Sequence, residues 1–167
     1  MNIVYLINVS KNENASLKAR HFLQKLFGED IIIKTDKNGK PYIEGNPEIH
    51  FNISHTDGLL AIAVSDYEVG IDAEKVREVD MREKKRFTKA EAEYVGESIN
   101  RFFEIWTKKE AFLKQKGVGL KGGLQSFSVL DKEINSRIST FFVGDFVVSV
   151  CFYKQNMEYI KKMASNF

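Results

Sequence analysis

The sequence is poor in the residues that build secreted scaffolds, since its 167 residues include one cysteine and two prolines. A single cysteine cannot form an internal disulfide, so a small disulfide-stapled fold is excluded. Cys151 lies in the stretch VVSVCFY among apolar and β-branched neighbours, which indicates a buried structural thiol and not a nucleophile. This cysteine usage predicts a reducing, cytoplasmic setting.

Long apolar runs and an excess of one charge are also missing. No stretch reaches the ~20 apolar residues that a membrane span needs. The start, MNIVYLINVSKNEN, lacks the basic region and the cleavage site of a secretory signal. The 25 Lys and Arg residues against 23 Asp and Glu give a net charge of +2, which is too balanced to indicate nucleic acid binding. We expect neither a membrane nor a nucleic acid partner.

What the sequence does contain is a succession of short strand patterns and two helical regions. Residues 15–27 predict a helix that ends at Gly28, and the composition is helical again from Asp80 to Gly117, where Thr88 and Glu91 form a capping box. The pair Asn38-Gly39 indicates a hairpin turn. The expected strands cover residues 2–9, 31–35, 41–45, 50–54, 59–65, 68–74, 126–130, 136–143 and 145–153, and residues 157–163 have no assigned structure.

This order of elements predicts an α+β fold, because the strands come in groups joined by tight turns and do not alternate with helices. No internal sequence repeat is visible. Two βαββ-like halves can nevertheless be distinguished, residues 1–60 and 61–167. We expect two pseudo-symmetric halves, each a small antiparallel sheet with packed helices, within one compact unit.

The stretch GIDAEK, residues 70–75, places Asp72 and Glu74 two positions apart. In a strand these carboxylates point the same way, about 6.6 Å apart along the chain, and repel one another. Val69, Ile71 and Ala73 would then fill the opposite, buried face. Gly70 has no side chain, so it leaves the carboxylate face open to a close approach. The spacing predicts a positively charged group beside the two carboxylates.

The helix expected over residues 101–117 carries an acid inside its apolar stripe. Glu110 projects between the directions of Phe103 and Trp106, where an unpaired carboxylate is costly to bury. Two interpretations remain open. Glu110 can form an ion pair with Lys114 one turn later, or it can join Asp72 and Glu74 as the third ligand of one hard cation, for which Mg²⁺ is suited.

Basic residues gather on the same helix and in the loop after it, which indicates a region that faces an anion. Residues 101–122 contain two acids, Glu104 and Glu110, against Arg101, Lys108, Lys109, Lys114, Lys116 and Lys121. Ser54 and His55, in the stretch NISH after an expected strand, are weaker candidates for contacts with a phosphate. Together, a hard cation and an anion-facing region predict a phosphate-containing substrate.

These segments resemble the 4′-phosphopantetheinyl transferases, of the type that activates surfactin synthetase. The resemblance runs in order through GKPYIEGNPEIHFNISHT, VGIDAEK, RFTKAEAEY and FFEIWTKKEAFLKQKGVGL, followed by SFSV, and covers about residues 39–130. It implies Mg²⁺-dependent transfer of the phosphopantetheine arm from coenzyme A to a serine of an apo acyl or peptidyl carrier protein, with release of adenosine 3′,5′-bisphosphate. It also implies a monomer with coenzyme A and Mg²⁺ in a cleft between the two halves.

The resemblance further implies roles for single residues. Asp72, Glu74 and Glu110 are similar to ligands of Mg²⁺, for which Mn²⁺ is an expected substitute, and Glu110 is also a candidate base for the acceptor serine. Lys114 and His55 would act on the pyrophosphate during catalysis. The positions similar to coenzyme A-binding residues are Arg20, Gly39, Lys40, Pro41, Ser54, His55, Lys109 and Lys114. The N-terminal part departs from the family, because only Lys11 stands where a basic cluster is usual.

Two other classes of function compete with the transferase. The departure at the N-terminus favours a non-catalytic protein that binds coenzyme A or a carrier protein. Acids, a lysine and a basic loop are also shared with metal-dependent phosphodiesterases and nucleases, although Asp-x-Glu differs from the Glu-x-Lys arrangement such nucleases often use. The sequence does not distinguish fatty acid, polyketide and peptide synthesis as the source of the acceptor.

Overall fold

The computed structural model describes residues 1–119 and 123–164. In chain order its elements are β1 (Asn2–Asn8), α1 (Ala15–Phe27), β2 (Ile33–Thr35), β3 (Pro41–Ile43), β4 (His50–Thr56), β5 (Leu59–Ser65), β6 (Val69–Lys75), the 3-10 helix η1 (Met81–Arg86), α2 (Lys89–Val95), α3 (Ile99–Lys116), α4 (Lys132–Asn135), β7 (Ile138–Val143), β8 (Phe146–Phe152) and β9 (Ile160–Ala164). Within the described ranges, every helix is too short or too polar to pass through a lipid bilayer.

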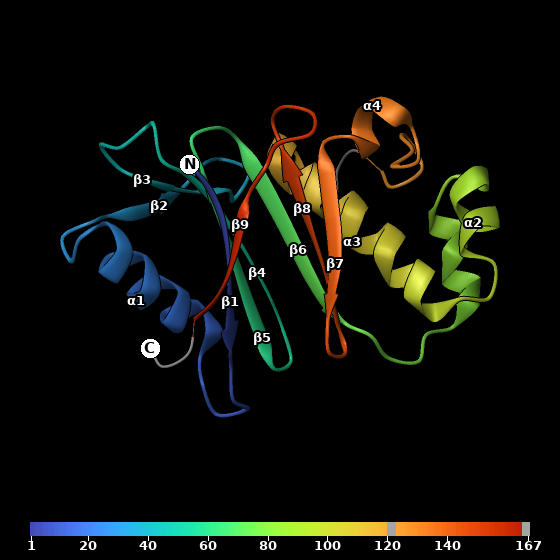
Figure 1. The fold of residues 1–167 in the computed structure, drawn as a ribbon, viewed down its shortest axis with the longest axis horizontal. Coiled ribbons are helices and arrows are strands. Elements are labelled where there is room, and N and C mark those ends of the chain that lie inside the picture. Colours follow the sequence, from blue (N-terminus) through green and yellow to red (C-terminus); the bar gives the residue numbers. More distant parts are fainter. Residues whose placement is uncertain (120–122, 165–167) are drawn as a thin grey trace.

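The strands form two sheets and one short hairpin, which confirms the α+β prediction. The first sheet has the order β4-β5-β1-β9, the second has the order β6-β8-β7, and β2 pairs with β3 around the predicted turn. All pairs are antiparallel except β1 with β9, which run parallel. Figure 1 shows α1 on one side of the sheets and α3 and α2 on the other.

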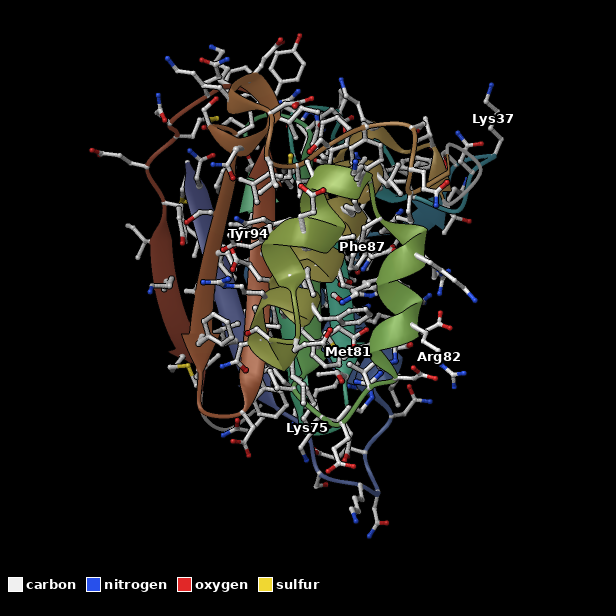
Figure 2. The ribbon with its side chains drawn as sticks, turned by 90° about the vertical axis from the view of Figure 1, so that its right-hand side faces the viewer. Lys37, Lys75, Met81, Arg82, Phe87 and Tyr94 are labelled. Carbon is white, nitrogen blue, oxygen red and sulfur yellow. The ribbon has the colours of Figure 1, made fainter. Side chains whose placement is uncertain are left out.

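Three apolar clusters hold these layers together. One lies between α1 and the first sheet and includes Phe22 and Phe51, and a second lies between the two sheets and includes Leu6 and Val150. The third lies where α2, α3 and the second sheet meet. In the view of Figure 2, η1 with Met81 and Arg82 stands beside α2 on the side that faces the viewer. The layers therefore follow the order α1, first sheet, second sheet and the remaining helices.

The division between the sheets differs from the predicted boundary at residue 60. Strand β5 belongs wholly to the first sheet, so the division falls between β5 and β6. The expected strand at residues 126–130 is wrong, because this segment forms bends and turns. Residues 157–163, which had no assigned structure, contribute to β9, and the C-terminal half therefore returns a strand to the first sheet.

The two sheets are joined along β4 and β6 by side chains and not by a backbone ladder. Three alternate side chains of β4 accept hydrogen bonds, at 3.0, 3.1 and 3.3 Å, from three alternate backbone N–H groups of β6. The accepting side chains are those of Asn52, Ser54 and Thr56, and the N–H groups are those of Ile71, Ala73 and Lys75. A strand exposes its side chains with a period of two, so the polar pattern on β4 matches the edge of β6.

Gly70 lets α3 approach β6 closely. A Cβ atom at this position would lie 2.1 Å from the carbonyl oxygen of Ala111 and 2.3 Å from the backbone nitrogen of Gln115. The close approach expected at this glycine is therefore made by helix backbone. Val69, Ile71 and Ala73 fill the other face of β6, as predicted, and Asp72 and Glu74 are turned toward α3.

Candidate active site

Ser54, Asp72 and Lys114 meet at the junction of the two sheets, each from a different element. The ammonium group of Lys114, on α3, donates to Asp72 Oδ1 on β6 at 2.7 Å and to Ser54 Oγ on β4 at 3.2 Å. The Ser54 hydroxyl donates to the same Oδ1 at 3.0 Å and accepts from the backbone N–H of Ala73. Lys114 is thus the positive group that the two carboxylates on β6 predicted.

Two buried carboxylate oxygens near this cluster have no hydrogen-bond partner in the described part of the chain, Asp72 Oδ2 and Glu110 Oε1. Burial raises the pKa of Asp72, and Lys114 and Ser54 offset part of that shift. Burial also raises the pKa of Glu110, with a smaller contribution from the charge of Asp72, while Lys114 and Arg86 act in the opposite direction. Unpaired buried carboxylate oxygens are costly, so this position favours a proton or a cation.

Glu74 lies at the edge of the same site. Its side chain is 24% exposed and accepts a hydrogen bond from Arg77 at 3.0 Å. No group of three or more His, Cys, Asp or Glu side chains in residues 1–119 and 123–164 has the spacing to hold a metal ion. Among these described residues the three predicted ligands are therefore not gathered into one metal-like group; Lys114 binds one oxygen of Asp72, and Arg77 binds Glu74. The free oxygens of Asp72 and Glu110 are nevertheless hard donors of the kind that Mg²⁺ prefers.

A cavity of about 190 Å³ adjoins Lys114. It is lined by Asn38, Gly39, Lys40, Pro41, Asn52, Ile53, Lys114, Gly117 and Gly119. The predicted loop at residues 39–41 is therefore brought together with Lys114, although the two are far apart in sequence. Lys40 forms an ion pair with Glu68 and donates to the carbonyl oxygen of Gln115 at 3.0 Å. This cavity can accept an anionic ligand beside two lysines.

Comparison with known proteins identifies the family of this chain. Residues 68–164 match the family model of the 4′-phosphopantetheinyl transferase superfamily. The chain belongs to this superfamily. It is 34% identical over 133 residues to the 4′-phosphopantetheinyl transferase psf-1 of Bacillus pumilus, an alignment that covers 74% of this chain and 57% of that protein. The predicted resemblance is confirmed.

Two further relatives show the same partial coverage. The chain is 40% identical over 106 residues to the 4′-phosphopantetheinyl transferase Sfp of Bacillus subtilis strain 168, covering 60% of this chain and 47% of that protein. With the 4′-phosphopantetheinyl transferase gsp of Aneurinibacillus migulanus it shares 36% identity over 106 residues, covering 59% and 44%. The chain spans about half the length of the curated relatives it matches.

Two predicted coenzyme A-binding residues of this superfamily member lie away from the Lys114 cavity. His55 is exposed on β4 and alternates with Ser54, so it faces the side of the first sheet that α1 covers. Arg20 is exposed on α1, on that same side of the sheet. Of the described residues, those that line the cavity include neither. The structure thus separates the predicted phosphate contacts into two places.

The position predicted for Lys109 requires a correction. Its side chain is fully buried and paired with Glu91, so it is not exposed to a ligand as the sequence suggested. A buried lysine needs a partner carboxylate, and α2 supplies one. Lys108 is also engaged, through Glu104 at 2.7 Å. Lys121 lies outside the described residues, and Arg101 and Lys116 are exposed on α3.

Two arginines near the site were not predicted. Arg77 stacks over Phe103 at 5.1 Å and Arg86 stacks over Trp106 at 4.9 Å. Both line a second cavity of about 150 Å³ that also includes Glu74. The sequence signal was the basic stretch that follows GIDAEK, which becomes informative once η1 is known to return toward α3. These arginines add positive charge on the side of the site opposite Lys40.

Proposed function

We propose that this chain transfers the 4′-phosphopantetheine arm from coenzyme A to a serine of an apo acyl or peptidyl carrier protein, in a Mg²⁺-dependent reaction that releases adenosine 3′,5′-bisphosphate. The observation that carries the proposal is the pair of buried, unpartnered oxygens on Asp72 and Glu110 beside Lys114. Buried carboxylates next to a cavity lined by lysines suit a hard cation and a phosphate ligand together. Membership in the superfamily supports the same reaction.

In this proposal Asp72, Glu74 and Glu110 hold the metal, with Mn²⁺ as an alternative, and water and phosphate oxygens complete its shell. When bound, Mg²⁺ would neutralise negative charge that develops on the pyrophosphate. The metal would use the free oxygens of Asp72 and Glu110, while Lys114 keeps its bond to Asp72 Oδ1. The ammonium group of Lys114 also lies at the cavity wall, where it can bind a phosphate oxygen of coenzyme A.

The remaining residues would orient the donor and move one proton. Gly39, Lys40 and Pro41 bound the cavity in which we expect part of coenzyme A, and Ser54 is hydrogen-bonded to Lys114 at the cavity wall. His55 and Arg20 would bind its outer phosphate groups from the α1 side. Glu110, whose pKa burial raises, would accept the proton of the acceptor serine directly or through one water.

We further propose that the protein acts as a monomer in the cytoplasm and meets an acidic surface of the carrier protein. Positive side chains border the site at Arg77 and Arg86, and both are held in place by stacking on aromatic rings. Charge complementarity of this kind steers partners and fixes their orientation. The natural carrier protein would belong to fatty acid, polyketide or peptide synthesis.

Intact mass spectrometry tests the proposal. A panel of apo carrier proteins is incubated with this protein, coenzyme A and Mg²⁺, with EDTA in a parallel reaction. We expect a gain of one phosphopantetheine on at least one carrier, and no gain with EDTA. If coenzyme A binds but no carrier gains mass, the protein is a non-catalytic binder. If a generic phosphodiester is hydrolysed without any carrier, the transferase proposal is wrong.

A further inference from the structure

Lys109 and Glu91 form a buried charge network next to the candidate active site but separate from it. Both side chains are fully buried, and Nζ of the lysine lies 2.8 Å from Glu91 Oε2. The same ammonium group donates to the carbonyl oxygens of Leu124 and Phe127 at 2.6 and 2.7 Å. An ammonium group has three N–H donors, so none is left for a substrate.

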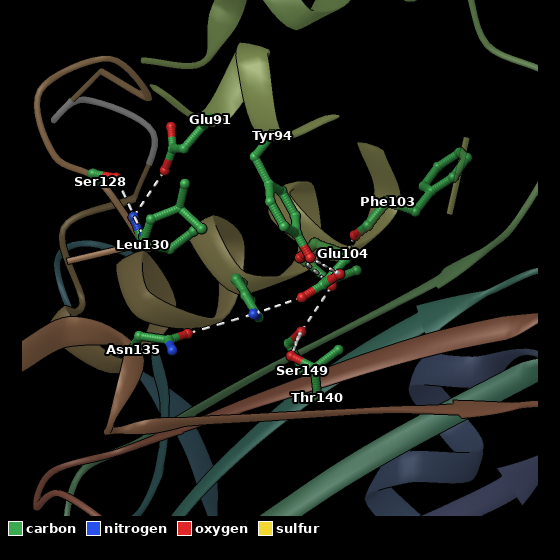
Figure 3. Close-up of polar contacts among 12 residues, drawn as sticks. Glu91, Tyr94, Phe103, Glu104, Ser128, Leu130, Asn135, Thr140 and Ser149 are labelled. Carbon is green, nitrogen blue, oxygen red and sulfur yellow. Dashed lines mark hydrogen bonds and ion pairs between the residues drawn. The ribbon is translucent and has the colours of Figure 1, made fainter. Parts of the chain in front are cut away.

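The carboxylate of Glu91 is also used completely. One oxygen accepts from the backbone N–H of Val129 at 2.8 Å, and the other caps α2 through the N–H and hydroxyl of Thr88, each at 2.9 Å. Figure 3 shows this contact between Glu91 and the turn that carries Ser128 and Leu130. The pair therefore ties α2, α3 and residues 123–129 to one another.

Residues 123–129, which we call the wall segment, depend on this pair for their position. The segment belongs to no sheet, and its carbonyl groups at Leu124 and Phe127 and its N–H at Val129 all bond to the two buried charges. A further contact runs from the Gln125 side chain to the carbonyl oxygen of Lys85 in η1. Buried backbone polar groups need partners, and here side chains supply them.

The wall segment borders a cavity of about 320 Å³ together with Arg86. Arg86 stacks on Trp106 and is close enough for its charge to act on Glu110. The wall segment thus shapes the surroundings of the arginine whose charge acts on Glu110. None of the described residues that line this cavity also lines the one at Lys40 and Lys114.

We propose that Lys109 and Glu91 are positioning residues that hold the wall segment beside Arg86 and so shape the acceptor side of the site. This inference rests on the proposed transferase function. Lys109 does not touch the substrate; it acts through the carbonyl groups that it binds. Loss of the Lys109–Glu91 pair, which we call the clamp, should impair use of the carrier protein. It should leave coenzyme A binding nearly unchanged, because the two cavities are separate.

Three variants distinguish positioning from simple charge balance. Lys109→Met removes the clamp and leaves the Glu91 carboxylate unpaired. The double variant Lys109→Met with Glu91→Gln removes both charges but still lacks a donor for the carbonyls of Leu124 and Phe127. Lys108→Met is the matched control, since this neighbouring lysine pairs with Glu104 on the same helix and does not bond to the wall segment.

The readouts are hydrogen exchange, calorimetric binding of coenzyme A, and KM and kcat for the apo carrier protein. In both Lys109 variants we expect faster exchange at Val129 and its neighbours, with the strands of the first sheet unchanged. We expect KM for the carrier to rise on the order of tenfold, with the Kd for coenzyme A within about twofold of the wild type. Lys108→Met should match the wild type.

Three results would overturn the inference. These are normal exchange in the wall segment of Lys109→Met, an equal loss of coenzyme A affinity, and full recovery of carrier KM in the double variant, which would leave charge balance as the only role. If the wild type itself transfers nothing, the proposed function fails. Hydrogen exchange in the wall segment would then still show whether Lys109 and Glu91 hold that segment in place. The affinity for coenzyme A would show whether their loss leaves coenzyme A binding unchanged.

Discussion

Lys114→Met should make the stability of this protein depend strongly on Mg²⁺. The lysine lies 2.7 Å from Asp72 Oδ1, and the two side chains are 30% and 8% exposed. Removal of one partner of a buried ion pair costs about 3 kcal/mol, because the other charge is left without compensation. In a chain of this size 1 kcal/mol changes the melting temperature by roughly 2–4 °C, so we expect a decrease of roughly 6–12 °C in EDTA.

Saturating Mg²⁺ should reverse most of this loss. A ligand at 100 times its Kd stabilises the folded state by about 2.7 kcal/mol. In the wild type the gain should be smaller, because Lys114 already compensates the charge of Asp72. Thermal melting of both proteins in EDTA and in MgCl₂, at mildly alkaline pH so that Asp72 stays ionised, measures the difference.

Lys116→Met is the matched control for this experiment, since Lys116 is exposed on the same helix and stacks over Phe112. It should melt like the wild type under both conditions. The reasoning is refuted if Lys114→Met is as stable as this control in EDTA, or if Mg²⁺ raises its melting temperature by no more than that of the wild type.

Three further predictions concern other parts of the site. Gly70→Ala should lower the free energy of unfolding by more than roughly 3 kcal/mol, because the new Cβ overpacks against rigid backbone. Gly45→Ala is the control, since a Cβ there meets no atom within 4 Å and should cost less. Equal losses of stability in urea unfolding would contradict this prediction. Burial raises the pKa of Glu110 above its ordinary 4.5. The contribution of Glu110 to stability is therefore complete below about pH 4.5 and is lost as the pH rises through the folded-state pKa. Glu110→Gln should flatten this pH dependence in metal-free urea titrations, and an unchanged slope would contradict the prediction. His55→Ala should raise the Kd for coenzyme A, measured by calorimetry, about tenfold, because one charge-assisted hydrogen bond is lost. An unaltered Kd would exclude a contact between His55 and a phosphate.

The strands and helices were predictable wherever a local pattern determined them. The capping box at Thr88 and Glu91, the turn at Gly39 and the alternation along β6 all reappear in the structure. Residues 126–130, which overlap the wall segment, were predicted as a strand from the pattern SFSVL. The backbone groups of the wall segment bond instead to charges buried on α2 and α3, and no local pattern reveals a partner so far away in sequence.

Several residues at the candidate site were predictable from the sequence, but their pairing was not. The acid in the apolar stripe of α3 signalled Glu110, and helical spacing suggested Lys114 as its partner. In the structure Lys114 pairs with Asp72 instead, because the fold brings β6 within reach of the same turn of the helix. Lys109 looked like one more basic residue of that helix, and only the position of α2 shows that it is enclosed.

The parallel pairing of β1 with β9 has a consequence for how the chain folds during synthesis. Strand β1 can pair with β5 as soon as the first sheet leaves the ribosome, but its other edge has no partner until β9 has been made. An unpaired strand edge invites pairing with other chains, and contacts between distant segments form late. Nascent copies of this protein should therefore need protection of that edge, and a lesion in β9 should appear first as aggregation in the cell rather than as altered catalysis.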